Sequence, residues 1–439
     1  MKKYFIILPI IICSTISNLL AEGETNIPKI TKSLSLEDCL KIASENNRQV
    51  LIMNEAGNQA EGKITEAKAG RYPSVSTTLN YTRIDQLQSF SMGGPKITTG
   101  SLDNYKAELS VRQSLYTGGI ISSGIKTAEL GQLIHKTQKE DLLRNLNFQI
   151  KKAYYDVLLD EETVKVNLKT EEASFAHLDD VTKQHKQGLV SNYDLLRAKV
   201  QLSNVRTMLI QSQSILKISK LFLINLIGLP LDSADILTLS DKLVYTSQIS
   251  NLKSQIPNYN NRPDLRAAQI KMDIQRETLK MAKAENIPSF SLVGSYGEEK
   301  PSRYTMGSIE WGNYWNISAI ISVPIFEGFR ISAKIRQETS ALQQAELAEL
   351  DLRERINLEL QQVIINIKDS IELIASQKEN VAQAEEGLRL VEIGYKNGVN
   401  TQLEVMDTQI ALDTASKNYI QAVYLYNIAQ AALESVIAK

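Results

Sequence analysis

Four stretches of the chain alternate apolar and polar residues with a period of two, the pattern of β-strands that have two different faces. Each stretch is about 9–11 residues long, the length that a tilted strand needs to cross a bilayer. The apolar faces are Val75, Thr77, Leu79 and Tyr81; Tyr105, Ala107, Leu109, Val111 and Leu115; Phe290, Leu292 and Tyr296; and Trp315, Ile317, Ala319, Ile321 and Val323. These faces suit a water-filled barrel in lipid, although a soluble antiparallel sheet would show the same alternation.

The segments that follow the strand pairs have a helical period instead. No proline occurs between Pro95 and Pro230 or after Pro324, so residues 119–186 and 328–396 can each form one helix of roughly 100 Å. Between Leu195 and Leu226 a heptad stripe alternates large and small residues. Its members are Leu195, Ala198, Leu202, Val205, Leu209, Ser212, Leu216, Ser219, Leu223 and Leu226. An ordinary coiled-coil stalk would show the same stripe.

The two halves of the chain repeat each other. The polar break "HKQGLVSNYDLLRAKVQL" (185–202) resembles "YKNGVNTQLEVMDTQIAL" (395–412), with Gly188 aligned to Gly398 and Asp194 to Glu404. Similar pairs are "YPSVSTTLNY" with "IPSFSLVGSY", "SLYTGGIISSGIK" with "PIFEGFRISAKIR", and "NNRQVL" with "NNRPDL". We therefore expect an internal duplication, in which each half runs helix, strand, strand, very long helix, polar break and long helix.

The N-terminus reads "MKKYFIILPIIICSTISNLLAEG". Two lysines precede an apolar run that is too short to span a bilayer, which predicts a secretory signal peptide over residues 1–21. No later apolar run reaches the roughly 18 residues of a transmembrane helix. The mature chain keeps one cysteine, Cys39, so it can form no intrachain disulfide.

Charge and motifs argue against nucleic-acid binding and catalysis. The 49 Lys and Arg residues nearly balance the 50 Asp and Glu residues, so no global field attracts nucleic acid. The histidines His135, His177 and His185 lack metal-ligand spacing, and no glycine-rich phosphate loop or nucleophile–base pair is discernible. We expect no enzyme activity, no cofactor and no metal site.

Four strands cannot close a barrel in lipid. Two strand edges would leave backbone groups unpaired in the bilayer, and membrane barrels begin at about eight strands. If the strands lie in lipid, several copies must share one barrel, so the sequence predicts an obligate oligomer.

In its motifs the chain resembles the TolC-like outer-membrane efflux proteins over nearly the whole mature length. The resemblance rests on "LSLEDCLKIASENN", "RYPSV", the strand exits "LYTGG" and "IFEGF", "RPDL", and the two polar breaks. It implies an α+β membrane protein: a homotrimer with a 12-stranded outer-membrane β-barrel, four strands per protomer, continued by a long periplasmic α-helical barrel. Residues 22–230 would be the first structural repeat, 231–261 an equatorial or linker segment, and 262–439 the second repeat with an equatorial C-terminal end.

The resemblance also assigns roles to the polar breaks. They correspond to helical-hairpin tips that close the channel and dock a periplasmic adaptor of an inner-membrane pump. The tip residues would be Gly188, Leu189, Val190, Ser191, Gly398, Val399, Asn400 and Thr401. Glu404 and Asp407, three apart on one helix face, would form the aperture ring. Asp194 would bond Tyr395 in a gate latch, in which the neutral Asn400 replaces a basic residue of the family prototype.

Three functions fit these expectations. The first is the outer-membrane exit duct of a tripartite efflux pump, and the second is a channel for type I polypeptide secretion. The third is an oligomeric coiled-coil structural protein of the periplasm. In each of the first two, the protein sits in the outer membrane and extends into the periplasm, in contact with outer-membrane lipid.

Overall fold

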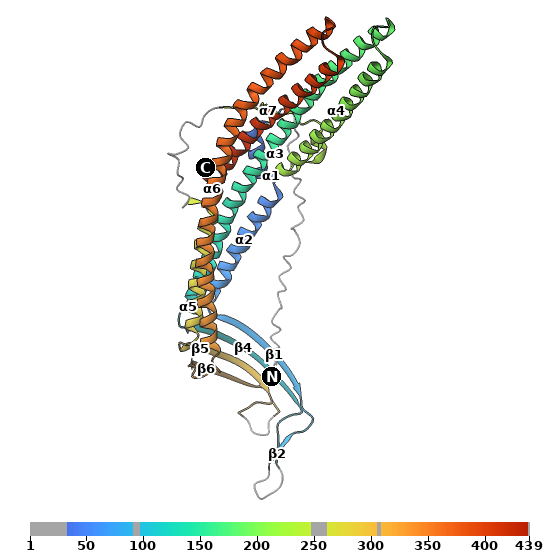
Figure 1. The fold of residues 1–439 in the computed structure, drawn as a ribbon. Coiled ribbons are helices and arrows are strands. Elements are labelled where there is room, and N and C mark those ends of the chain that lie inside the picture. The colour runs from blue at the N-terminus through green and yellow to red at the C-terminus, as the bar shows by residue number, and fades with distance from the viewer. Residues whose placement is uncertain (1–32, 91–96, 247–260, 305–308, 438–439) are drawn as a thin grey trace.

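The computed structural model describes residues 33–90, 97–246, 261–304 and 309–437. The molecule is elongated, with helices along most of its length and a curved sheet at one end (Figure 1). The expected signal peptide, residues 1–21, lies outside the described residues, as do residues 247–260 of the expected linker.

The helices confirm the two very long elements that the proline distribution allowed. Both α3 and α6 have 67 residues, which corresponds to about 100 Å at 1.5 Å per residue. The helices are α1 (Leu36–Asn46), α2 (Arg48–Ala69), α3 (Ile120–Lys186), α4 (Asn192–Ile227), the 3₁₀ turn η1 (Leu231–Ala234), α5 (Pro263–Ala284), α6 (Arg330–Lys396) and α7 (Gln402–Val436). Across the described parts of the chain, no helix combines the length and the apolar composition of a membrane span.

The four expected strands form one antiparallel sheet in the order β1-β4-β5-β6. They are β1 (Ser74–Arg83), β4 (Asp103–Tyr116), β5 (Ser289–Lys300) and β6 (Gly312–Ser322). A short hairpin, β2 (Gln88–Phe90) with β3 (Ile97–Thr99), was not predicted, because three residues are too few to show a period.

The register confirms the predicted strand faces. Leu79 pairs with Ala107, Leu109 with Tyr296, and Tyr296 with Trp315. Directly paired residues point to the same side of an antiparallel sheet, so the predicted apolar residues share one face, apart from Leu115 at the irregularity between Ser114 and Tyr116. Val293, Tyr314 and Ile320 lie on the other face. The serines, Asn80, Lys106 and Glu108 lie on the opposite, polar face.

Two hydrophobic clusters hold the helices together near the middle of the molecule. One packs α1, α3 and α4 against residues 229–239, around buried Tyr154 and Ile150. Its edge is closed by a parallel bridge between Leu34 and Leu239. The other cluster joins α6 and α7 around Tyr426. Leu243 packs against both clusters, so the segment after η1 ties the two helix pairs together.

The "RPDL" motif that opens the second half has a structural role. Arg262 is only 3% exposed, and it pairs with Asp264 and Glu359. Its guanidinium also donates to the carbonyl oxygen of Val436, and Arg144 donates to that of Ser435. Two arginines therefore satisfy carbonyls at the end of α7, where cations are favourable.

The glycines that end α4 and α3 allow a matched stability test. Gly228 has φ 80°, and a Cβ there would lie 2.5 Å from the carbonyl oxygen of Asn46. Gly188 has φ 74° with nothing within 4 Å of such a Cβ. We expect Gly188→Ala to cost about 1 kcal/mol of unfolding free energy, and Gly228→Ala at least about twice that, because backbone must also move. Denaturant titration followed by circular dichroism measures both free energies. Equal losses in the two variants would show that the backbone at the α1–α4 contact moves without measurable cost.

Candidate functional site at the helical tips

The two polar breaks lie at the end of the molecule opposite the sheet (Figure 1). One joins α3 to α4 and the other joins α6 to α7, so each is the tip of an antiparallel helical hairpin. The structure therefore brings the expected tip residues of both halves to the same end of the chain.

Each hairpin turns through the same glycine motif. Gly188 and Gly398 adopt φ 74° and 75°. The amide after each glycine, Leu189 or Val399, donates to a carbonyl five residues back, Gln184 or Gly394. Each glycine amide donates to a carbonyl three residues back. These are the two bonds of a Schellman motif, whose left-handed residue favours glycine.

Each following helix begins with a capping box. Ser191 caps α4 and exchanges hydrogen bonds with Asp194, while Thr401 caps α7 and exchanges them with Glu404. The side chains of Asp194 and Glu404 thus satisfy backbone amides that have no partner within the helix. This explains why the two acids align in the repeat. The patterns S-x-x-D and T-x-x-E carry this signal in the sequence.

The residues of the expected latch have other hydrogen-bond partners in this structure. Tyr395 Oη donates to Gln184 Oε1 over 3.3 Å, and the carboxylate of Asp194 is held by Ser191. The expected hydrogen bond between Asp194 and Tyr395 is therefore not formed within this protomer. The pKa of Tyr395 is raised first by burial and then by the charge of Asp194. Asn400 donates to Glu404 over 3.2 Å.

A residue that sequence analysis missed joins the two tips. Gln402 Nε2 donates to the backbone oxygen of Asp194 over 3.1 Å, and Gln402 is only 7% exposed. Its Oε1 is buried without a hydrogen-bond partner in the described chain. His177 lies on α3 with its ring 5.8 Å from that of Tyr395. No local motif could indicate these contacts, because they depend on how the hairpins pack.

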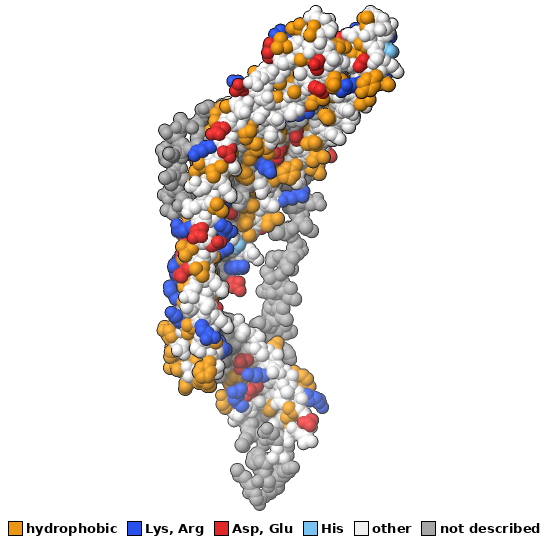
Figure 2. Space-filling view, viewed as in Figure 1, with side chains coloured by type: hydrophobic (Ala, Val, Ile, Leu, Met, Phe, Trp, Pro, Cys, Tyr) orange, Lys and Arg blue, Asp and Glu red, His pale blue; other side chains and the backbone are white. Residues whose placement is uncertain are grey.

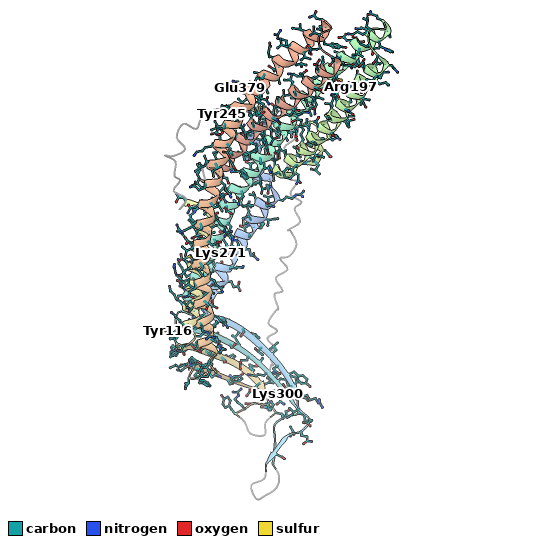
Figure 3. The ribbon with its side chains drawn as sticks, in the orientation of Figure 1. Tyr116, Arg197, Tyr245, Lys271, Lys300 and Glu379 are labelled. Atoms are coloured by element: carbon teal, nitrogen blue, oxygen red, sulfur yellow. The ribbon has the colours of Figure 1, made fainter. Side chains whose placement is uncertain are left out.

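The two expected aperture acids are exposed on the first turns of α7. The pKa of Glu404 is lowered, first by the hydrogen bond from the Thr401 amide and then by those from Asn400 and the Thr401 hydroxyl. Asp407 follows one turn later on the same face. In the first hairpin, Arg197 takes the position that aligns with Asp407, so the two tips differ in charge (Figure 3).

Comparisons with known proteins identify the family. A model described as outer membrane efflux protein matches residues 39–229 and 259–439. The chain belongs to the outer membrane efflux protein family. Outer membrane protein TolC of Vibrio cholerae is 24% identical over 419 residues, covering 92% of this chain and 90% of that protein. The alkaline protease secretion protein AprF of Pseudomonas aeruginosa is 22% identical over 414 residues, covering 91% and 84%.

Solved structures show the same fold. The outer membrane protein VceC from Vibrio cholerae matches with a TM-score of 0.78 and 17% identity, covering 92% of this chain and 95% of that one. Family membership confirms the expectation of an outer-membrane efflux channel that extends into the periplasm and is not an enzyme. It also sets aside the structural stalk. Among the described residues, no cluster of His, Cys, Asp and Glu is arranged to hold a metal ion.

The environment of His177 makes the contact between the hairpins sensitive to acid. Burial lowers the pKa of His177, and the charges of Asp180 and Glu392 partly oppose this effect. The imidazole of His177 therefore binds a proton more readily in the unfolded chain than in the folded one. Its contribution to the stability of the folded hairpins is full above the unfolded pKa of about 6.5, and it is lost as the pH falls below that value.

We therefore expect the tip amides to exchange hydrogen faster at pH 5.5 than at pH 7.5, after correction for intrinsic rates. His177→Gln should remove most of this difference, while His135→Gln, far from the tips on α3, should keep it. Hydrogen-exchange mass spectrometry of the purified protein measures the effect. An unchanged difference in His177→Gln would rule out this residue as its source.

Proposed function

We propose that three copies of this protein form the exit duct of a tripartite efflux pump, gated at its helical tips and docked there to a periplasmic adaptor. The proposal rests on the way one chain places a sheet and two helical hairpins at its opposite ends. It has an open sheet with one apolar face at one end, and two helical hairpins with an acidic turn at the other.

The sheet supports a shared 12-stranded barrel. In the described chain, β1 and β6 each pair with only one strand, so both sheet edges are open. Lipid provides no hydrogen bonds for such edges. Pairing of β6 with β1 of the next protomer would close the barrel, with the apolar face toward lipid and the polar face around the lumen.

The helices also expose apolar surface that a second copy would cover. Figure 2 shows apolar side chains along the helical part of the molecule. On α4 the exposed residues Met208, Ile215 and Phe222 recur every seven positions, beside the buried heptad stripe. On α6 they include Leu347, Leu358 and Ile365. Large exposed stripes of this kind mark protein interfaces.

Matching element lengths support the proposed duplication. The very long helices have 67 residues each, α2 and α5 have 22 each, and α4 and α7 have 36 and 35. We propose the repeats at 22–230 and 262–439, with 231–261 as the equatorial linker between them.

The tips supply the proposed gate. Within one protomer they are joined by the neutral bonds of Gln402 to the Asp194 carbonyl and of Tyr395 to Gln184. Asn400, at the basic position of the family prototype, instead braces Glu404. The proposed latch is therefore an amide latch, in which Asp194 contributes its backbone and the cap of its own helix.

The proposed aperture and docking surface lie beside this latch. Three copies of Glu404 and Asp407 would place six carboxylates around the closed tips, which attracts cations and repels anions. Leu189 and Val399, at the apices, are 71% and 79% exposed. Exposed apolar side chains at two adjacent apices suit a partner that binds the tips end-on. With Gly188, Val190, Ser191, Gly398, Asn400 and Thr401, they form the proposed adaptor surface.

Type I polypeptide secretion remains the second candidate function, because AprF, whose name records protease secretion, is similar over most of its length. The channel itself would be alike in both. Co-purification of the partner complex distinguishes them, since an efflux pump and a polypeptide exporter differ in their inner-membrane component.

The aperture predicts the ionic selectivity of the channel. Glu404→Gln with Asp407→Asn should reduce cation preference, because it removes six charges from the trimer while glutamine keeps the capping box. Glu379→Gln, exposed farther along α6, is the control and should leave selectivity unchanged (Figure 3). Reversal potentials in a planar bilayer under a salt gradient measure this. Unaltered selectivity in the double variant would remove both acids from the aperture.

The amide latch predicts how readily the tips open. Gln402→Ala removes one neutral hydrogen bond of about 1 kcal/mol from each protomer, so the ratio of open to closed dwell times should rise about fivefold for each protomer whose tips must separate. Gln409→Ala, two turns along α7, is the control. Single-channel recording measures the dwell times. If both variants match the wild type, Gln402 does not restrain the tips.

A further inference from the structure

A tyrosine near the far end of the sheet is buried where its strand is otherwise exposed. Tyr314 on β6 is 4% exposed, whereas Trp315 beside it is 69% exposed. The register places Tyr314 opposite Gly297 on β5, and Gly297 opposite Glu108 on β4. All three therefore lie on the polar face of the sheet.

The tyrosine side chain crosses β5 to reach β4. Its hydroxyl donates to Glu108 Oε2 over 2.5 Å, two strands away. Gly297 makes this crossing possible, because a Cβ at that position would lie 2.7 Å from the tyrosine ring. A glycine covered by an aromatic ring is a known way to fix strand register.

Arg303 covers the other side of the ring. Its guanidinium carbon lies 3.9 Å from the ring centroid, and its Nη2 lies 2.7 Å from Glu299 Oε2. Glu299 is on the polar face, paired with Lys106, and Lys106 in turn contacts Glu108 over 2.8 Å. Arg303 follows β5 by only three residues, so the chain after Lys300 turns back over the polar face instead of continuing outward.

We propose that this cluster of Lys106, Glu108, Glu299, Arg303 and Tyr314 forms a second constriction, at the outer mouth of the channel. The inference rests on the proposed barrel, in which the polar face lines the lumen. Figure 3 places Lys300, at the end of β5, far from the helices, and Tyr116 at the helical end of the sheet. Three copies of Arg303 would then project over the lumen at the mouth farthest from the tips.

The charges of the cluster indicate what it does there. Two basic and two acidic side chains are paired, so the constriction is neutral and restricts size more than the sign of charge. Replacing one partner unbalances it: loss of Arg303 leaves an excess of three negative charges per trimer, and loss of the Glu299 charge leaves three positive ones.

The experiment measures the width of each mouth separately. Protein added to one side of a planar bilayer inserts with its helices on that side, because the helical part cannot cross the membrane. Uncharged polyethylene glycols of graded mass, added only to the opposite compartment, then report which sizes enter the outer mouth. We expect Arg303→Ala to admit larger polymers than the wild type from that compartment, with no change from the helical side.

The chain offers a matched control at the same height. Arg83 pairs with Asp103 over 3.1 Å at the same end of the sheet but on the opposite face. Arg83→Ala should therefore leave polymer entry unchanged. In addition, Arg303→Ala and Glu299→Gln should shift the reversal potential in opposite directions. Arg303→Lys keeps the positive charge but loses the guanidinium contacts with Glu299 and the Tyr314 ring. The largest polymer that it admits should lie between those of the wild type and Arg303→Ala, which preserves the test if the alanine variant does not assemble.

The outcomes separate this inference from the proposed function. If the wild type conducts but Arg303→Ala and Arg303→Lys admit the same polymers as the wild type, the outer constriction is wrong and the duct stands. If the assembled wild type forms no channel at all, the barrel itself is wrong. Equal effects of Arg83→Ala and Arg303→Ala would also overturn the inference, because they would show a general loosening of the sheet end.

Discussion

A helix of 67 residues has no interior of its own, so its apolar side must be covered by other helices along its whole length. In this structure α3 meets that requirement with four long partners: α4, α2, α5 and α7. The long helices from both halves of the chain thereby share one central element. Because α3 also runs from the end of β4 to the first tip, it fixes where the tips lie relative to the sheet.

The strength of the packing differs along this axis. In the middle, fully buried residues such as Ile150, Tyr154 and Tyr426 fill continuous clusters. At the tips, each hairpin is closed by its own turn and capping box, whereas the two hairpins are joined by a few neutral contacts, among them those of Gln402 and Tyr395. Hairpins that are closed internally and joined to each other by few contacts can separate without unfolding.

The parts that could be predicted from the sequence are those encoded locally. Strand faces follow from alternation, the long helices from missing prolines, and the tip turns from Gly188 and Gly398. The contact between the two hairpins could not be predicted, because it depends on which side chains meet when the hairpins pack: the Asp194 carboxylate caps its own helix, and Gln402, which belongs to no motif, donates to the Asp194 backbone. The Tyr314 crossing was hidden for the same reason, since Gly297 and Glu108 become its neighbours only through strand register.

In the proposed trimer, the two ends of the polar path would restrict passage by different means. The acids Glu404 and Asp407 are exposed and carry no basic partner among the described side chains, so their charges add and act on any ion that approaches the tips. At the outer mouth each acid has a basic partner within hydrogen-bond reach, so the field largely cancels. A field that acts before entry selects by charge, whereas a neutral ring of bulky side chains selects by size. A duct that has the first at its entrance and the second at its exit separates these two tasks along one path.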